Sequence, residues 1–430
     1  MPGDASPSPC REVLAHVQQH GVLDNGPVPS QPSGEVPPED GALPAPSRAA
    51  WGDRPFGMYV HVPFCTTRCG YCDFNTYTAP ELAGPTGVDR STFAGHLAGE
   101  VSFARAVLGD RDVPVSTVFV GGGTPTLLAP DALGAVLGRI GREFGLAPGA
   151  EVTCEANPDS VDARSLAGLL EAGFTRISFG MQSAVPRVLA VLERTHTPGR
   201  ALRAVDQATA AGFAHVSLDL IYGTPGESLE DWGTSVDAAL GSGAQHVSAY
   251  ALIVEEGTRL AAAIGRGTIA APDDDLMADM YELADERFGA AGLPWYELSN
   301  WAAAGHECRH NLGYWHGDDW WGVGPGAHSH VAGTRWWNVK HPAAYASRLR
   351  AGASPAVGRE VLDPATRRVE DLMLRVRLAE GLALGDLSEA QRAEALRAAA
   401  DGLAEVSAER LVLTRRGRLL ADAVVRRLVA

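Results

Sequence analysis

Residues 59–72 read YVHVPFCTTRCGYC and hold three closely spaced cysteines directly after a short apolar run. Its apolar opening predicts a strand over 58–62, and Cys65, Cys69 and Cys72 fall on the loop that follows. Three close thiolates suit an iron–sulfur cluster. A cubane cluster has four irons, so three thiolates leave one iron without a protein ligand. The stretch therefore predicts a cluster loop in which one iron is open to a small molecule.

Three other interpretations of these cysteines are open on spacing alone. A zinc site usually takes four Cys or His ligands, often as two separated pairs. A disulfide would leave one of the three cysteines unpaired. The three thiols could also be unrelated buried side chains, and only the rest of the chain bears on that possibility.

The chain from residue 58 to residue 252 alternates short apolar runs with longer amphipathic segments. Strands are predicted at 58–62, 116–120, 151–155, 175–179, 215–220 and 246–252, and helices at 91–108, 131–144, 162–172, 199–211 and 228–240. Repeated β-then-α units imply parallel strands with crossover helices. Six units predict an α/β fold with a partial (β/α)6 TIM-type barrel. A doubly wound open sheet is the alternative, because periodicity does not separate the two.

Composition divides the chain into four parts. Residues 1–50 are rich in Pro, Gly and Ser and are predicted to be a disordered extension, with a weak helix signal over 11–20. Residues 51–295 form the barrel core. Residues 296–362 form a connecting region rich in Trp and His. Residues 363–430 are predicted to form a small winged-helix-like domain, with a strand at 411–413 and a closing helix over 416–429 that Thr414 caps. One helix face in this segment is predicted from the spacing of Val369, Leu372, Met373 and Val376.

The charge, the apolar runs and the cysteine content limit which partners and which compartment suit this chain. The formal net charge of −16 argues against nucleic acid, so the arginines of the last segment are interpreted as a solvated helix face: Arg415, Arg416, Arg418, Arg426 and Arg427. No run of apolar residues is long enough for a membrane span, and the first residues lack the apolar core of a signal peptide. Six cysteines, three of them in one loop, suit a reducing cytoplasm, and Cys10 is expected to be inert.

Unusual residues follow the predicted strands one after another. A glycine run occupies 121–123, Glu155 ends the third strand, and Asp219 ends the fifth. Gln182 ends the fourth strand, and Arg194 follows it. In a β/α barrel the functional residues lie at the carboxyl ends of the strands. Each residue alone suits a cap or a turn, but their joint placement favours a binding site.

With these motifs the chain resembles the radical S-adenosylmethionine (SAM) superfamily, through the Cys-x-x-x-Cys-x-x-Cys loop. The Gly-Gly-Gly-Thr-Pro-Thr run at 121–126 and the run at 219–225 look like the branch that contains oxygen-independent coproporphyrinogen III dehydrogenase. The resemblance covers about residues 55–430. It implies a [4Fe-4S] cluster on the three cysteines, with SAM chelating the fourth iron. The residues that it assigns to SAM binding are Tyr59, Tyr71, Gly122, Gly123, Thr124, Glu155, Gln182, Arg194, Asp219 and Ala251.

Two details separate this chain from the dehydrogenase pattern. That pattern has a further cysteine two residues after the motif, where this chain has Phe74. The run His310-Asn311-Leu312-Gly313-Tyr314-Trp315 resembles the motif of the heme chaperones in the same branch. The resemblance therefore implies heme binding and delivery to an acceptor protein. His310 is the predicted axial ligand and Cys308 the second candidate, because heme takes an imidazole or a thiolate in an aromatic pocket.

Two other functions are compatible with the cluster loop. The alternative is the dehydrogenase itself, an oxidative decarboxylase that converts coproporphyrinogen III to protoporphyrinogen IX. An electron-transfer or scaffold protein that uses the cluster alone is a third possibility. It leaves the glycine run and the strand-end carboxylates unexplained. The run 322–328, which ends at His328, resembles the loop near the adenosyl group in the same branch.

Overall fold

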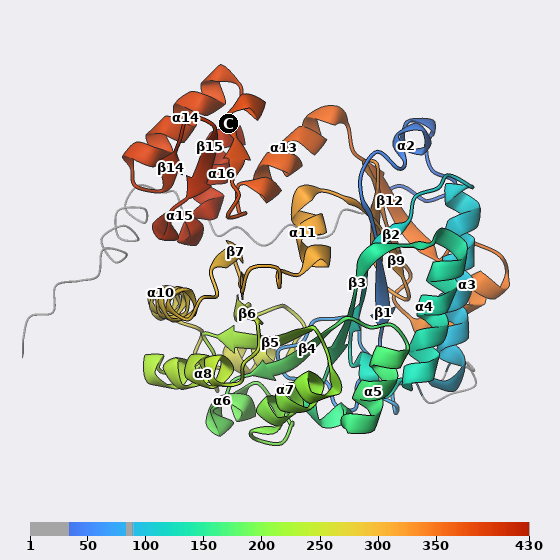
Figure 1. Ribbon diagram of the computed structural model, residues 1–430, viewed down its shortest axis with the longest axis horizontal. Helices are drawn as coiled ribbons and strands as arrows, with labels where there is room; N and C mark the ends of the chain where they lie inside the picture. Colours follow the sequence, from blue (N-terminus) through green and yellow to red (C-terminus); the bar gives the residue numbers. More distant parts are fainter. Residues whose placement is uncertain (1–33, 83–87, 89, 430) are drawn as a thin grey trace, which may run out of the picture.

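Six parallel strands in chain order form the centre of the molecule (Figure 1). The computed structural model describes residues 34–82, 88 and 90–429. The strands are β1 (Phe56–Val62), β2 (Val115–Gly122), β3 (Leu146–Ala156), β4 (Arg176–Gln182), β5 (His215–Tyr222) and β6 (His246–Ala251). Each pairs in parallel with the next. In a doubly wound sheet the order of the strands reverses at a central strand. Here the order runs from β1 to β6 without a reversal, so the partial barrel is confirmed.

Crossover helices cover the outside of these strands (Figure 1). They are α3 (Arg90–Leu108), α4 (Pro130–Phe144), α5 (Ala163–Glu171), the short α6 (Pro186–Val191), α7 (Arg200–Ala211) and α8 (Leu229–Gly241). The apolar face predicted for 131–144 is buried in α4, where Leu133, Val136 and Ile140 are at most 2% exposed. The amphipathic period thus marked the side that packs on the sheet.

The sheet continues past both ends of the six-strand core. At the β1 edge, β9 (Asp319–Val323) is parallel to β1, and β10 (His328–Val331), β11 (Thr334–Asn338) and β12 (Ala356–Val361) follow antiparallel. At the other edge, β8 (Asn300–Ala302) and β7 (Trp295–Glu297) join β6. The Trp- and His-rich region thus supplies strands to both edges of one twelve-stranded sheet.

The remaining helices of this part connect those strands. They are α9 (Arg259–Gly265), α10 (Asp274–Ala290), α11 (Arg309–His316) and α12 (Pro342–Arg350).

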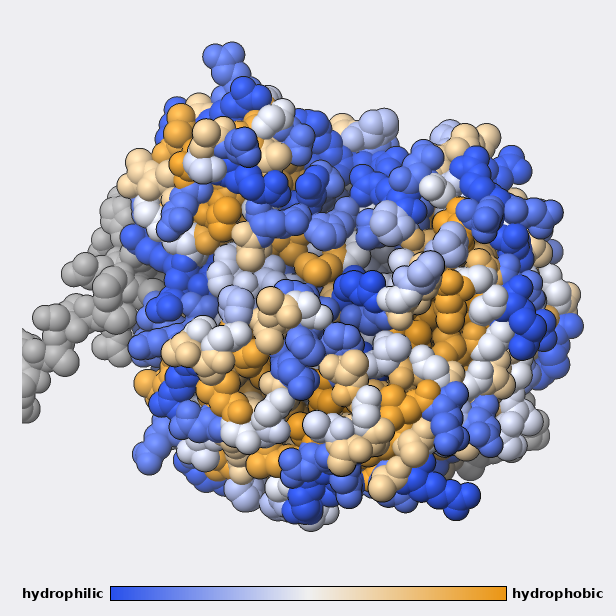
Figure 2. All heavy atoms as spheres, in the orientation of Figure 1, coloured by the Kyte–Doolittle hydropathy of each residue, from blue (hydrophilic) through white to orange (hydrophobic). Residues whose placement is uncertain are grey.

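Hydrophilic and apolar residues are interspersed on the face shown in Figure 2. Within the described residues, no helix has the length and apolar character needed to cross a membrane.

The prediction of disorder through residue 50 is wrong for residues 34–50. Helix α2 (Ala45–Ala50) forms there, and Leu43 is 5% exposed. Proline is compatible with this helix because it lies in the first turn, where no N–H is needed. Glu35 pairs with Arg359 of β12 through backbone hydrogen bonds and an ion pair. Cys10 and the helix predicted over 11–20 lie outside the described residues.

The C-terminal part has its own apolar core and a three-stranded antiparallel sheet, as predicted for a winged-helix-like unit. Its elements are α13 (Pro364–Arg375), β13 (Leu382–Ala383), α14 (Glu389–Ala400), β14 (Ala404–Val406), β15 (Arg410–Leu413), α15 (Arg415–Leu419) and α16 (Ala421–Val429). Thr414 caps α15 as expected. The single closing helix predicted over 416–429 is instead two helices, because the chain leaves helical geometry at Leu420.

Two expectations about C-terminal side chains need correction. Arg418 is 7% exposed and pairs with Asp285 of α10, so it joins the C-terminal part to the barrel rather than facing solvent. Of the helix face predicted at 369–376, Leu372 and Val376 are buried, but Val369 and Met373 are 39% and 37% exposed. The predicted helix forms, but only part of its predicted apolar face packs against the core.

Candidate functional site

The three motif cysteines lie on the loop after β1 and line one cavity of about 960 Å³. Backbone hydrogen bonds hold the loop: the Cys65 amide donates to the Tyr77 carbonyl (3.0 Å) and the Gly70 amide to Leu192 (3.1 Å). All three thiols are partly exposed and in the free form. The parallel strands thus present three sulfur donors at one end of the barrel.

The electrostatic environment of the thiols suits metal-driven deprotonation. Burial raises the pKa of Cys65, and it raises the pKa of Cys72 to about 11. The Arg194 guanidinium donates a hydrogen bond to the Cys69 sulfur at 3.6 Å, which places a positive charge beside the three thiols. Among the described residues, no three Cys, His, Asp or Glu side chains converge on a single metal ion. Three thiols spread along one loop fit a cluster, which takes its ligands on separate irons.

The glycine run after β2 faces the cysteine loop directly. A Cβ atom on Gly123 would lie 2.5 Å from the Phe64 carbonyl oxygen and 3.0 Å from the Cys65 sulfur. Gly122 has φ +111°, and its amide donates to Glu155 Oε2 at 3.0 Å. Only glycine allows this approach, so the run brings backbone polar groups beside the thiols.

Two carboxylates lie deeper in the same cavity. Burial, and then the negative charge of Asp219, raise the pKa of Glu155 to about 8, and burial also raises the pKa of Asp219. The Ser178 hydroxyl donates to both oxygens of Asp219, at 2.9 and 3.1 Å. A buried pair of carboxylates is stabilised by a nearby cation. The cavity therefore suits a ligand that carries positive charge and hydroxyl donors.

The end of β4 adds an amide and a guanidinium. Gln182 is buried and has φ +65°, a strained backbone conformation that recurs at ligand sites. Arg194 donates to the Gly180 carbonyl (2.9 Å) and to His196 Nδ1 (3.3 Å). Burial and the charge of Arg194 lower the pKa of His196 to about 4, so the ring is a neutral acceptor. These contacts fix Arg194 between the barrel and the thiols.

All fourteen predicted site residues line this one cavity. Besides those above, they are Tyr59, Tyr71, Thr124, Ala251 and His310. The cavity also contains residues that the sequence did not single out, among them Phe119, Arg176, Ser178, His196 and His246. Phe119, Arg176, Ser178 and His246 lie on strands and His196 lies on the segment after α6, and apart from the polar character of four of them no sequence signal marked these residues.

Comparison with known proteins agrees with this geometry. The family model described as the radical SAM superfamily matches residues 59–239. The chain is 55% identical to the protein named heme chaperone HemW of Mycobacterium tuberculosis (strain ATCC 25618 / H37Rv), over 89% of this chain and 97% of that protein. The chain belongs to the HemW family of radical SAM proteins.

More distant members and one solved structure extend the comparison. Heme chaperone HemW of Escherichia coli (strain K12) is 37% identical over 64% of this chain and 70% of its own length. Coproporphyrinogen III oxidase HemN from Escherichia coli, described as a radical SAM enzyme, superimposes with a TM-score of 0.75. That likeness covers 89% of this chain and 92% of HemN at 21% identity, so it concerns the fold alone.

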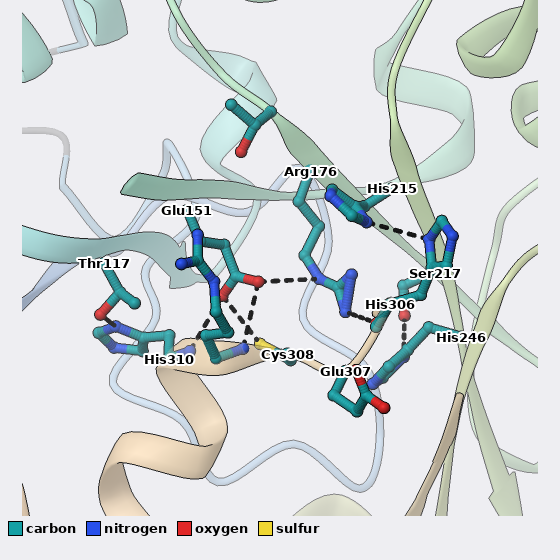
Figure 3. Close-up of polar contacts among 12 residues, drawn as sticks. Thr117, Glu151, Arg176, His215, Ser217, His246, His306, Glu307, Cys308 and His310 are labelled. Carbon is teal, nitrogen blue, oxygen red and sulfur yellow. Dashed lines mark hydrogen bonds and ion pairs between the residues drawn. The ribbon is translucent and has the colours of Figure 1, made fainter. Parts of the chain in front are cut away.

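The HemW-like motif at 310–315 lies within helix α11, and its residues His310, Asn311 and Tyr314 line the cavity. Figure 3 shows His310 beside Thr117. His310 is 4% exposed, and its ring stacks on Phe119. Its Nδ1 is hydrogen-bonded to the Thr117 hydroxyl and its Nε2 to the Tyr314 hydroxyl, both at 2.8 Å. Iron coordination by His310 would therefore break one of these bonds.

Cys308, the second predicted heme ligand, is also enclosed. It is 6% exposed, and its thiol donates to Glu151 Oε1 at 3.6 Å. Burial, and then the negative charge of Glu151, raise its pKa to about 12, so the thiol is neutral. Ligation by the thiolate would need both exposure and deprotonation.

A buried carboxylate that the sequence analysis missed fixes the HemW-like helix. Glu151 accepts hydrogen bonds from the amides of Arg309 (3.1 Å) and His310 (2.9 Å), the first residues of α11 (Figure 3). A carboxylate is favourable at a helix N-terminus. Arg176 balances its charge at 3.9 Å, and both side chains are at most 4% exposed. The motif is thus anchored to β3 and β4 through one ion pair.

Proposed function

We propose that this protein is a heme chaperone. It binds a [4Fe-4S] cluster, SAM and heme, and it transfers the heme to an acceptor protein in the cytoplasm. The observation that carries this proposal is the meeting of three thiols, the glycine run and the buried carboxylates in one cavity of a HemW-family chain. The free state of all described cysteines agrees with a reducing compartment.

The residues divide between the two cofactors by their chemistry. Cys65, Cys69 and Cys72 would hold the cluster, which supplies a single electron when present. Glu155 and Asp219 accept hydrogen bonds from an amine or from hydroxyls, and Arg194 pairs with a carboxylate.

The other predicted residues surround these groups. Gly122, Gly123 and Thr124 offer backbone and hydroxyl groups to the amino-acid part of SAM, and Gln182 supplies an amide. Tyr59, Tyr71 and Ala251 line the same cavity; the two tyrosines would flank the cluster, and Ala251 would contact the adenine.

Phe74 bears on the choice between chaperone and dehydrogenase. Its side chain is 62% exposed and lines the cavity beside the thiols, where the dehydrogenase pattern has a cysteine. A phenyl ring has no thiol to contribute. This substitution favours the chaperone over the decarboxylating enzyme.

The deciding experiment uses the full chain after anaerobic reconstitution with iron and sulfide. Hemin binding is followed by the Soret band, transfer by mixing with apomyoglobin, and decarboxylation by chromatography of coproporphyrinogen III products. We expect the protein to bind heme and to transfer it to apomyoglobin, without converting coproporphyrinogen III. Sustained formation of protoporphyrinogen IX would overturn the chaperone assignment, and so would the absence of heme binding.

A matched variant tests the cluster ligands. Cys69→Ala removes one of three thiolates and should abolish the iron–sulfur absorbance, whereas Cys154→Ala, at a buried cysteine on β3, should retain it. A full complement of iron in Cys69→Ala would contradict the three-thiolate assignment.

A further inference from the structure

The glycine-rich run at 322–328 has no role in the function proposed above. Its residues 324–327 connect β9 to β10 and pack against both ends of the cysteine loop. A Cβ atom on Gly324 would lie 2.6 Å from the His61 carbonyl oxygen, and one on Gly326 would lie 2.6 Å from Asn75 Nδ2. Both glycines have positive φ angles, +114° and +74°. Glycine alone suits these two positions, so the run can touch the segments before and after the thiols.

Asn75, three residues after Cys72, ties the cysteine loop to this run. Its side-chain amide donates to the carbonyl oxygens of Pro325 (2.9 Å) and Lys340 (2.8 Å). Its own carbonyl oxygen is hydrogen-bonded to Nε2 of His61 at 2.9 Å, and that histidine is 6% exposed. The three contacts join the end of the cysteine loop to β1 and to two segments that are distant in the sequence.

The segment 75–77 in turn braces the cysteine loop. The Cys65 amide donates to the Tyr77 carbonyl oxygen at 3.0 Å. From within the loop, the Arg68 guanidinium donates to the Thr76 carbonyl oxygen and, at 3.3 Å, to its hydroxyl. Residues 75–77 therefore contact the loop at its first cysteine and again in its middle.

The buried carboxylate of Glu100 holds the glycine-rich run from the other side. Glu100 lies on α3 and is 0% exposed. Its Oε2 accepts hydrogen bonds from the Gly324 amide at 2.7 Å and from the Tyr345 hydroxyl at 2.5 Å. Its Oε1 accepts from Asn338 Nδ2 at 2.8 Å, and the same amide donates to the Gly324 carbonyl oxygen at 2.9 Å. Both backbone polar groups of Gly324 are thus held.

The donors to Glu100 come from three separate segments: the run itself, β11 and α12. Burial raises the pKa of this carboxyl group to about 7, which reflects the cost of placing a charge there. An apolar side chain would fill the same space without that cost, but it would not orient the Gly324 backbone. The contacts of Glu100 therefore fix how the run lies against α3.

We propose that Glu100 and Asn75 are positioning residues for the iron–sulfur cluster. Glu100 fixes the backbone of Gly324, the run fixes Asn75, and the segment 75–77 sets the path of the cysteine loop. This inference rests on the proposed function, because it takes the three thiols to be cluster ligands. Removing a group that orients metal ligands typically costs about 10–100-fold in metal affinity.

The test follows the cluster in the reconstituted full chain. Glu100→Gln keeps the shape of the side chain but removes one acceptor oxygen, and Asn75→Asp removes the donor to the two carbonyl oxygens. Each variant should lower the affinity for cluster iron by about tenfold in competition with EDTA, and it should shift the g values of the reduced cluster in EPR. Wild-type affinity and an unchanged EPR spectrum in both variants would overturn the proposal.

Glu227→Gln is the matched control. Glu227 is 3% exposed, burial likewise raises its pKa to about 7, and it accepts a hydrogen bond from the Thr224 amide at 3.1 Å. It does not line the cavity of the thiols. This variant should keep the iron affinity of the wild type. If Glu227→Gln weakens the cluster as much as Glu100→Gln does, loss of stability explains the effect and the positioning role is wrong.

Hydrogen–deuterium exchange of the cluster-free protein separates positioning from a general loss of structure. Glu100→Gln and Asn75→Asp should speed amide exchange in residues 64–78 by about fivefold, the factor expected when one hydrogen bond is lost. Strands β4 and β5 should exchange at the wild-type rate. Faster exchange throughout the barrel, or wild-type exchange at residues 64–78, would contradict the positioning role.

The failures of the two proposals are distinguishable. If the wild-type chain takes up no cluster during reconstitution, the proposed function fails and the positioning role fails with it. If the wild type takes up the cluster and both variants behave like the wild type, only the positioning role is wrong.

Discussion

Replacing Glu151 by Gln tests the physical basis of the anchored helix α11. The change keeps the shape of the side chain and removes its charge. In the wild type this carboxylate receives the Arg309 and His310 amides at 3.1 and 2.9 Å and faces Arg176 at 3.9 Å. Arg176 is 1% exposed, and its Nη1 already lacks a hydrogen-bond partner within the described residues. Glu151→Gln therefore leaves a buried cation without its counter-charge.

The expected cost follows from that burial. Removing one partner of a buried ion pair typically costs about 3–5 kcal/mol, a large part of a total stability of about 5–15 kcal/mol. We expect Glu151→Gln to lower the free energy of unfolding by about 3–5 kcal/mol. Urea titration with tryptophan fluorescence measures it. Glu256→Gln, at an exposed turn residue, is the control and should change stability by less than about 0.5 kcal/mol.

A double variant isolates the ion pair. In Glu151→Gln/Arg176→Met the buried positive charge is also removed, so the loss should be smaller than the sum of the two single losses. Additive single losses, or a Glu151→Gln variant as stable as the control, would refute the role assigned to this pair.

Three further predictions test other parts of the molecule. Gly123→Ala should reduce iron incorporation, because its Cβ would lie 2.5 Å from a carbonyl oxygen; Gly95→Ala, with open space around it, should not, and equal iron in both would contradict the close approach. Arg418→Met should destabilise the protein by about 3 kcal/mol in urea, because Asp285 loses contacts at 2.7 and 2.8 Å, and an unchanged midpoint would exclude that anchor. Glu155 has its pKa raised from 4.5 to about 8, so the folded state binds more protons than the unfolded state between these values and stability falls as pH rises. The stability gain of Glu155→Gln in the cofactor-free protein should accordingly grow from pH 5 to pH 8, and a gain independent of pH would contradict the shift.

The local and periodic features of this protein could be predicted from its amino-acid sequence. The three-cysteine loop followed from spacing, and the six core strands followed from runs of apolar residues, because these signals lie within a few consecutive positions. Strand order was also implied, since short βα units place neighbours side by side. The residues expected at strand ends reached one cavity because parallel strands have their carboxyl ends at the same edge.

Which polar residues face one another depends on how distant segments of the chain pack together. Glu151 meets the first residues of α11 across a gap of more than one hundred positions in the chain, and no local pattern encodes that contact. The same holds for Arg418 and Asp285, where a residue interpreted as solvated is buried. The sequence analysis offers His310 as the heme ligand and Cys308 as the second candidate. Both are buried and hydrogen-bonded in the structure, because Thr117 of β2 and Glu151 of β3 fold against them from distant parts of the chain.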